Sequence, residues 1–195
     1  MARILVLTGH PRAESFCAAL AERYVDGARA AGHEVRLRAL SEIGPDLVAP
    51  DYHGDGGVLP AWVTDLQADL TWCEHWVIVA PMWWGGLPAG LEAVFDRVLL
   101  PGFAFRYHRE GIGWDRLMKG RSARAILTMD TPPFVLRWLW GRPILRRLKI
   151  QVFGFCGFAP VRFTTFGVVR KSTPEKRAAW LAEVEALGRS GVRGS

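Results

Sequence analysis

The chain has 195 residues and a mass of 21.7 kDa, the length of one ordinary domain. Half of its residues are hydrophobic and 23% are charged, which excludes a disordered tail, a fibrous repeat and a disulfide-stapled mini-protein. A net charge of +6 favours anionic partners such as phosphates, nucleic acid or acidic lipid, without choosing among them. We expect one domain over residues 1–190 and a frayed tail over residues 191–195.

The hydrophobic pattern alternates between strands and helices along the chain. Hydrophobic patterns predict strands over 4–7, 76–80, 123–129 and 161–166, and also over 35–39, where apolar residues alternate with Arg36 and Arg38. Apolar faces at helical spacing run from Phe16 to Ala28, Ala61 to Thr71, Leu91 to Leu99, Phe134 to Leu139, Ile144 to Phe153 and Trp180 to Leu187. Loops are expected over 41–60 and 101–120. This order predicts a doubly wound, five-stranded parallel α/β sheet, which binds ligands at the carboxyl ends of its strands.

Cysteine content and hydropathy bear on the compartment. Cys17, Cys73 and Cys156 make an odd count without CxxC spacing, which indicates neither a disulfide framework nor a zinc site and fits a reducing cytoplasm. The apolar run 4–7 is too short for a signal peptide, and no charge-free window is long enough to span a membrane. The sequence also lacks an HExxH motif, a Gly-x-Ser-x-Gly elbow and a recognised nucleic-acid motif. We therefore expect a cytoplasmic protein without metal, nucleic acid or an integral membrane segment.

The most hydrophobic stretch, 134–160, is interrupted by basic residues at 137, 142, 146, 147 and 149. Two interpretations are open. An amphipathic, basic segment that carries tryptophan can make peripheral contact with a membrane surface. Alternatively, it is a helix that packs on the core or on a second subunit.

Polar and aromatic residues follow three of the predicted strands. After the first strand, His10 and Ser15 are hydrogen-bond donors, and the amides of Phe16 and Cys17 would begin a helix, where an anion is favoured. No dinucleotide fingerprint or P-loop is present. A Ser15 that merely caps the helix explains the pattern equally well.

The loops after the third and fourth strands have similar pairs of interpretations. In the loop 81–88, a flat ligand can stack on an indole while the glycine amides approach its edge, or the loop is a buried subunit contact. Residues 128–131 offer hydroxyls and backbone donors to the same ligand, or they cap the next helix.

Four segments in consistent order carry a family resemblance. They are His10-Pro11 with Glu14-Ser15-Phe16, the loop Pro81 to Ala89, Phe95-Asp96-Arg97-Val98 with Pro101 to Phe105, and Phe153 to Phe158. Together they resemble the flavodoxin-like NAD(P)H:quinone oxidoreductases of the DT-diaphorase and modulator of drug activity type. The chain departs from that family's pattern at Cys17, where Asn is usual, and at 128–133, where Thr-Thr-Gly-Gly is usual.

The resemblance implies a flavodoxin-like, three-layer fold with strand order 2-1-3-4-5 and a non-covalent flavin, FMN or alternatively FAD. It also implies a homodimer with the flavin at or near the interface. The implied flavin-binding residues are His10, Ser15, Phe16, Cys17, Met82, Trp83, Trp84, Gly85, Thr128, Met129, Asp130 and Thr131. An apolar substrate pocket would be lined by Trp83, Trp84, Phe103, Phe105 and Tyr107.

The implied activity is ping-pong transfer of two electrons from NAD(P)H to a quinone or similar aromatic acceptor, with the flavin rather than a side chain carrying the chemistry. Arg12 and the basic cluster 137–147 could bind an NADPH 2′-phosphate. Alternatively, the cluster is exposed to solvent or forms part of an interface. The alternative function is a flavin-binding regulatory subunit of a membrane transport system with little turnover of its own. The segment 134–149 would then be its docking surface.

Overall fold

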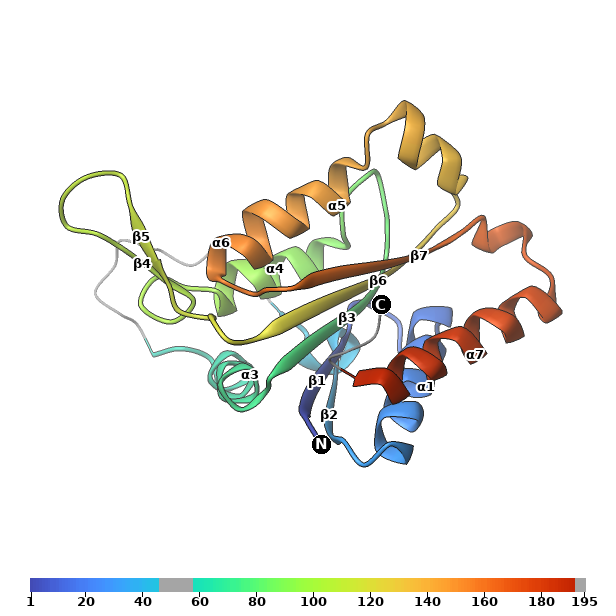
Figure 1. Ribbon diagram of the computed structural model, residues 1–195, viewed down its shortest axis with the longest axis horizontal. Coiled ribbons are helices and arrows are strands. Elements are labelled where there is room, and N and C mark those ends of the chain that lie inside the picture. Colours follow the sequence, from blue (N-terminus) through green and yellow to red (C-terminus); the bar gives the residue numbers. More distant parts are fainter. Residues whose placement is uncertain (46–57, 192–195) are drawn as a thin grey trace.

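The computed structural model describes residues 1–45 and 58–191 and is built on a parallel sheet with strand order β2-β1-β3-β6-β7 (Figure 1). The strands are β1 (Arg3–Thr8), β2 (Glu34–Ala39), β3 (His75–Pro81), β6 (Ser122–Met129) and β7 (Val161–Gly167). The predicted fold class and the predicted order 2-1-3-4-5 are confirmed, with β6 and β7 as the fourth and fifth predicted strands. The central strands β3 and β6 are buried along their whole length because helices cover both of their faces.

One face of the sheet is covered by α1 (Phe16–Ala30) and α7 (Pro174–Ser190), which lie side by side in Figure 1. Two glycines let these helices touch. A Cβ on Gly27 would lie 2.0 Å from the Glu185 carbonyl oxygen, and one on Gly188 would lie 2.1 Å from the Tyr24 carbonyl oxygen. Any larger residue at either position would push the two backbones apart.

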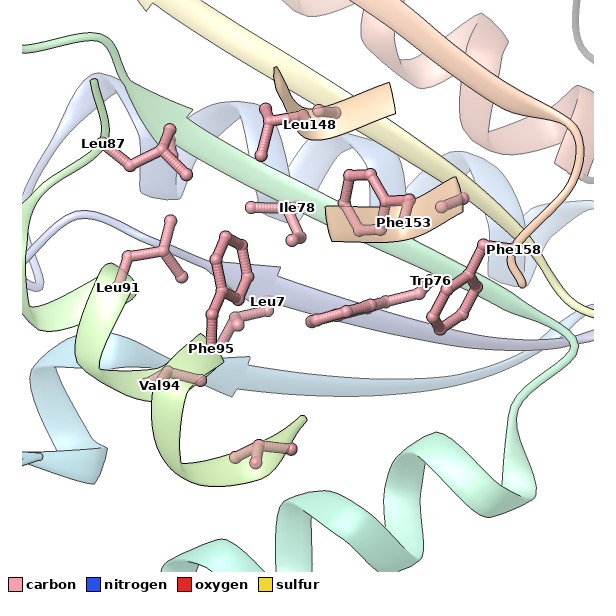
Figure 2. Close-up of a cluster of buried hydrophobic side chains, with 14 of the residues drawn as sticks. Leu7, Trp76, Ile78, Leu87, Leu91, Val94, Phe95, Leu148, Phe153 and Phe158 are labelled. Carbon is pink, nitrogen blue, oxygen red and sulfur yellow. The ribbon is translucent and has the colours of Figure 1, made fainter. Parts of the chain in front are cut away.

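The opposite face holds the larger core. Its helical elements are α2 (Leu40–Ile43), α3 (Ala61–Trp72), α4 (Ala89–Val98), α5 (Pro143–Arg147), the π-helix η2 (Leu148–Phe153) and α6 (Gly154–Cys156). Figure 2 shows Trp76 of β3 between Phe95 and the pair Phe153 and Phe158. The Trp76 ring meets Phe95 and Phe153 edge to face, at centroid distances of 5.9 and 5.5 Å.

The predicted loop 101–120 contains an antiparallel hairpin of β4 (Phe105–Tyr107) and β5 (Trp114–Arg116). Trp114 anchors it, because its indole stacks on Phe155 at 4.6 Å and its Nε1 donates to the Phe155 carbonyl at 2.9 Å. Strands of three residues leave too short a pattern to be recognised in a sequence. Of the predicted loop 41–60, residues 46–57 lie outside the described residues.

The stretch 134–160 divides at Gly141 and Arg142, both of which have positive φ angles. Beyond this break, Ile144, Leu148 and Phe153 are buried, so the segment packs on the core as one of its two interpretations predicts. Before it, the π-helix η1 (Val135–Leu139) rises from the carboxyl end of β6, in gold in Figure 1. In the described ranges, no helix is both long and apolar enough to cross a bilayer. Of the predicted tail, residues 192–195 lie outside those ranges, and the one-domain division stays a prediction.

Candidate functional site

A cavity of about 340 Å³ lies at the carboxyl ends of β1, β3, β6 and β7, where a doubly wound sheet binds its ligands. It brings together nine of the twelve predicted flavin-binding residues: His10, Ser15, Phe16, Cys17, Met82, Trp83, Thr128, Met129 and Asp130. The other three, Trp84, Gly85 and Thr131, do not line it. Because no ligand contact defines a role, the roles of these residues stay predictions.

The first loop places a neutral imidazole in the wall of the cavity. The Gly9 amide donates to the Val79 carbonyl at 2.8 Å, which ties the loop to β3. His10 is only 7% exposed, and its Nδ1 accepts the Arg12 amide at 3.0 Å. Burial lowers the pKa of His10, and the nearby Arg12 guanidinium lowers it further. The neutral ring therefore carries its proton on Nε2, which makes that nitrogen a hydrogen-bond donor.

The start of α1 supplies further donors. Ser15 is the N-cap, and its Oγ accepts the Ala18 amide at 3.2 Å, so its interpretation as a cap is correct. The hydroxyl hydrogen is still available to a ligand, since this bond uses only the oxygen as acceptor. The amides of Phe16 and Cys17 lie in the first helical turn, where no earlier helical carbonyl can accept them. Together with the helix dipole, they favour an anion here.

Cys17 and Thr128 join the first loop to the end of β6. The Cys17 Sγ lies 3.3 Å from the Thr128 Oγ1, and both side chains are buried. Burial raises the pKa of Cys17 to about 11, so the group stays a thiol at neutral pH. The neutral thiol therefore lines the cavity, and the group at this position that would suit an anion is the backbone amide.

The loop after β3 forms a tight turn at the rim. Reciprocal backbone bonds join Trp83 and Gly86 at 3.0 and 2.8 Å, and the two residues between them have φ angles of 52° and 75°. These positive angles describe a type I′ turn, which favours Gly or Asn at both central positions. Here Trp84 occupies the first of them and is fully exposed. Trp83 points back to the cavity, edge to face with His10 at 5.5 Å.

The end of β6 accommodates side chains where the resembled family has glycine. Met129 is 3% exposed and belongs to the core that Figure 2 shows in part. Asp130 Oδ1 accepts the Arg170 amide at 2.7 Å, which binds it to the short helix η3 (Val169–Lys171) after β7. Asp130 thus caps a segment 40 residues away rather than the helix that follows it. Thr131 packs its carbonyl against Gly167, where a Cβ would lie 2.6 Å away.

Four cavity residues are absent from the predicted flavin-binding set: Arg12, Pro81, Val169 and Arg170. Arg12 and Arg170 add positive charge beside the helix start. The residues after β7 could have been found from the sequence, because the rule that ligands bind at strand ends applies to the fifth strand as well.

The predicted substrate-pocket residues fall in different parts of one chain. Phe105 and Tyr107 line a separate cavity of about 720 Å³ between α4, the hairpin and η2. Phe103 is half-buried against the core and lines neither cavity. Figure 1 shows the hairpin at the opposite end of the sheet from the carboxyl ends of the strands. A single chain therefore does not bring Phe105 and Tyr107 to Trp83.

The described residues, 1–45 and 58–191, hold no group of three His, Cys, Asp or Glu side chains that could bind a metal ion. The cavity instead combines neutral donors, helix amides and arginines with an indole wall. A doubly wound sheet with such a cavity at its carboxyl edge, and without a dinucleotide fingerprint, defines a flavodoxin-type α/β protein. A family model described as flavodoxin-like fold matches residues 2–187, and the chain belongs to this family.

Named relatives cover almost the whole chain. An uncharacterized NAD(P)H oxidoreductase of Haemophilus influenzae is 28% identical over 188 residues, covering 91% of this chain and 89% of the relative. The FMN-dependent NADH:quinone oxidoreductase 1 of Bradyrhizobium diazoefficiens is 29% identical over 187 residues, covering 86% and 87%. Among solved structures, Smu.1420 from Streptococcus mutans superposes with a TM-score of 0.83 at 27% identity, over 96% of this chain and 99% of that one.

Proposed function

We propose that this protein is an FMN-dependent oxidoreductase that passes two electrons from NAD(P)H to a quinone or similar aromatic acceptor. The observation that carries the proposal is the convergence of His10, the start of α1, Trp83 and Thr128 on one cavity at the carboxyl edge of the sheet. The relatives from Haemophilus influenzae and Bradyrhizobium diazoefficiens, named as oxidoreductases that use NAD(P)H or NADH, support the same activity.

The residues of the cavity fit the phosphate end of FMN. A phosphate needs several donors and a positive surrounding, which the neutral His10, the Ser15 hydroxyl and the two helix amides would supply beside Arg12. The buried, neutral state of His10 matters, because it fixes a directed Nε2–H donor instead of a second cation. FAD would require room beyond this phosphate.

The opposite wall suits a flat aromatic ring. Met82 and Trp83 would pack on such a ring and exclude water from it, and the Met82 amide is itself held on the Thr128 carbonyl at 2.7 Å. FMN, when bound, supplies two-electron hydride chemistry that no side chain can provide. The role of the protein is then to position first the electron donor and then the acceptor at the same rim of the cavity.

We propose further that the working unit is a cytoplasmic homodimer with its site at the interface. The separation of Phe105 and Tyr107 from Trp83 on one chain supports this arrangement, since a second copy would supply the missing wall. The exposed positions of Trp84 and Tyr107 also favour it, because large apolar side chains are stabilised when a partner covers them.

The test begins with the visible absorption spectrum of the purified protein after incubation with FMN or FAD and removal of the excess. We expect flavin peaks after FMN, bleaching by NADH or NADPH under anaerobic conditions, and recovery when a naphthoquinone is added. A protein that retains neither flavin would contradict the proposal. Bound flavin with negligible quinone turnover would instead support the regulatory-subunit alternative.

A further inference from the structure

The net positive charge of this protein is concentrated in one segment. Residues 131–174 contain eight Lys or Arg residues and no Asp or Glu, whereas the remainder of the chain has 17 basic and 19 acidic residues. The entire positive excess therefore comes from the segment that follows β6 and includes η1, α5, η2 and β7. Such an asymmetry produces a local positive field on a molecule that is otherwise close to neutral.

Four of these cations surround one cavity. Arg137, Arg142, Arg146 and Lys149 line a hollow of about 580 Å³ whose remaining walls are mostly apolar. Within residues 1–45 and 58–191, no carboxylate forms an ion pair with any of the four. Arg147 differs, because it forms a double hydrogen bond with Glu92 of α4 at 2.6 and 2.7 Å. The other four charges are therefore available to an external anion.

Large apolar side chains lie among these cations instead of beneath them. Trp138 is 74% exposed, and the Arg137 guanidinium lies over its ring at 4.8 Å. A second hollow places Trp140 and Ile150 beside Arg146, which borders both hollows. Two further exposed side chains, Phe134 and Leu139, flank this set. We call the whole the basic aromatic surface: Phe134, Arg137, Trp138, Leu139, Trp140, Arg142, Arg146, Lys149 and Ile150.

We propose that the basic aromatic surface docks the protein on anionic phospholipid membranes. Exposed Trp and Leu side chains partition into the boundary between headgroups and acyl chains, while Arg and Lys attract acidic headgroups. Figure 1 places η1 at the periphery, where it rises from the strand ends without a neighbouring element beyond it. The inference is independent of the flavin chemistry proposed above, since no residue of the basic aromatic surface lines the cavity at the strand ends.

Charge complementarity distinguishes a membrane from a second copy of the chain. A twofold interface would bring the same patch of both subunits together. Here that would oppose two sets of unpaired cations without a carboxylate between them, which is unfavourable. An acidic lipid surface offers the opposite sign over a wide area and an apolar layer for the tryptophans.

The test is sedimentation with vesicles of phosphatidylcholine alone or with 30% phosphatidylglycerol, at low and high salt. We expect binding to the anionic vesicles only, weakened by salt because charge attraction is screened. The triple variant R142Q/R146Q/K149Q should bind about 100-fold more weakly, since each cation near a lipid surface contributes about fivefold. The matched control R23Q/R29Q/R189Q removes the same charge from exposed positions on α1 and α7 and should bind like the unmodified protein.

A second pair of variants tests the apolar part at constant charge. W138A/W140A should reduce binding to anionic vesicles about tenfold or more, whereas I112A, at a fully exposed position in the hairpin loop, should not change it. Equal losses in the two triple variants would overturn the proposal by showing attraction through net charge alone.

Three other outcomes would also overturn the proposal. The first is absence of binding to anionic vesicles. The second is conversion of a dimer to a monomer by W138A/W140A in light scattering, which would identify a contact between copies. The third is loss of a preference for NADPH over NADH in R142Q/R146Q/K149Q without a change in vesicle binding, which would assign the hollow to the nucleotide.

Discussion

The loops after β1 and β3 border the same cavity but are built in opposite ways. The first is closed on itself, with His10 buried, its Nδ1 bound to a backbone amide, and Ser15 capping α1. The second places Trp84, a large apolar residue, in full solvent exposure at a positive φ angle that suits Gly or Asn. The difference teaches that the chain itself holds the polar groups of the first loop in place, whereas the rim displays a large apolar side chain that the same chain does not cover.

The largest effect should come from the sheet beneath both loops. Trp76→Ala removes the ring that contacts Phe95 and Phe153, and we expect the free energy of unfolding to fall by about 3–5 kcal/mol. Urea unfolding followed by circular dichroism measures it. Trp138→Ala, at an exposed position, is the matched control and should change stability by less than about 0.5 kcal/mol. Similar losses of unfolding free energy in the two variants would show that the buried Trp76 ring stabilises the core beneath the loops no more than an exposed tryptophan does.

Ser15→Ala sharpens the comparison on the side of the first loop. We expect FMN to bind about 10- to 100-fold more weakly, because a hydrogen bond to a charged group is lost, and stability to fall by about 1 kcal/mol with the cap. Thr173→Ala is the matched control, since Thr173 caps α7 through the same kind of bond and does not line the cavity. Fluorescence titration with FMN measures both variants. Equal FMN affinity in the two would restrict Ser15 to a capping role.

Trp84→Asn tests the second loop and should move stability and activity in opposite directions. Asn tolerates the left-handed conformation, so we expect the turn to gain about 0.5–1 kcal/mol. If the proposed acceptor packs on this indole, kcat/KM for quinone reduction should fall about tenfold, as for the loss of one aromatic contact. Thermal unfolding and steady-state kinetics report the two effects separately. An unchanged kcat/KM would exclude Trp84 from the acceptor site.

The smallest effect is a pH dependence in the first loop. Burial and Arg12 lower the pKa of His10, so the unfolded chain binds a proton more readily than the folded one. The contribution of His10 is therefore complete above a pH of about 6.5 and is lost as the pH falls below it. His75, whose pKa burial lowers to about 3, acts in the same direction. The measurement is the free energy of unfolding as a function of pH, compared between His10→Asn and the unmodified protein, both without flavin. Parallel stability curves would contradict the prediction.

The sheet could be predicted from the sequence because its strands follow hydrophobic patterns, such as the continuous apolar run 76–80 and the alternation of apolar residues with Arg36 and Arg38. Motif order and the ends of the first, third and fourth strands indicated most of the cavity. The hairpin β4–β5 could not be predicted, since strands of three residues have no clear period.

What the sequence could not reveal are distances set by the fold. The bond between Asp130 and the Arg170 amide joins residues 40 positions apart, and nothing local to either indicates it. The separation of Phe105 from Trp83 is of the same kind, because the direction of α4 across the sheet decides it. The exposure of Trp84 follows from the geometry of the turn, in which Trp84 and Gly85 have positive φ angles that the sequence alone does not specify.

The burial of the cysteines has a chemical consequence. Cys17, Cys73 and Cys156 are each at most 3% exposed, and burial raises the pKa values of their thiols to between about 11 and 12. Quinones of the kind proposed as acceptors are electrophiles that alkylate thiolates, and a thiol held protonated by burial is a poor nucleophile even where, as at Cys17, it lines the cavity. We therefore expect the three cysteines to react slowly with the proposed acceptor.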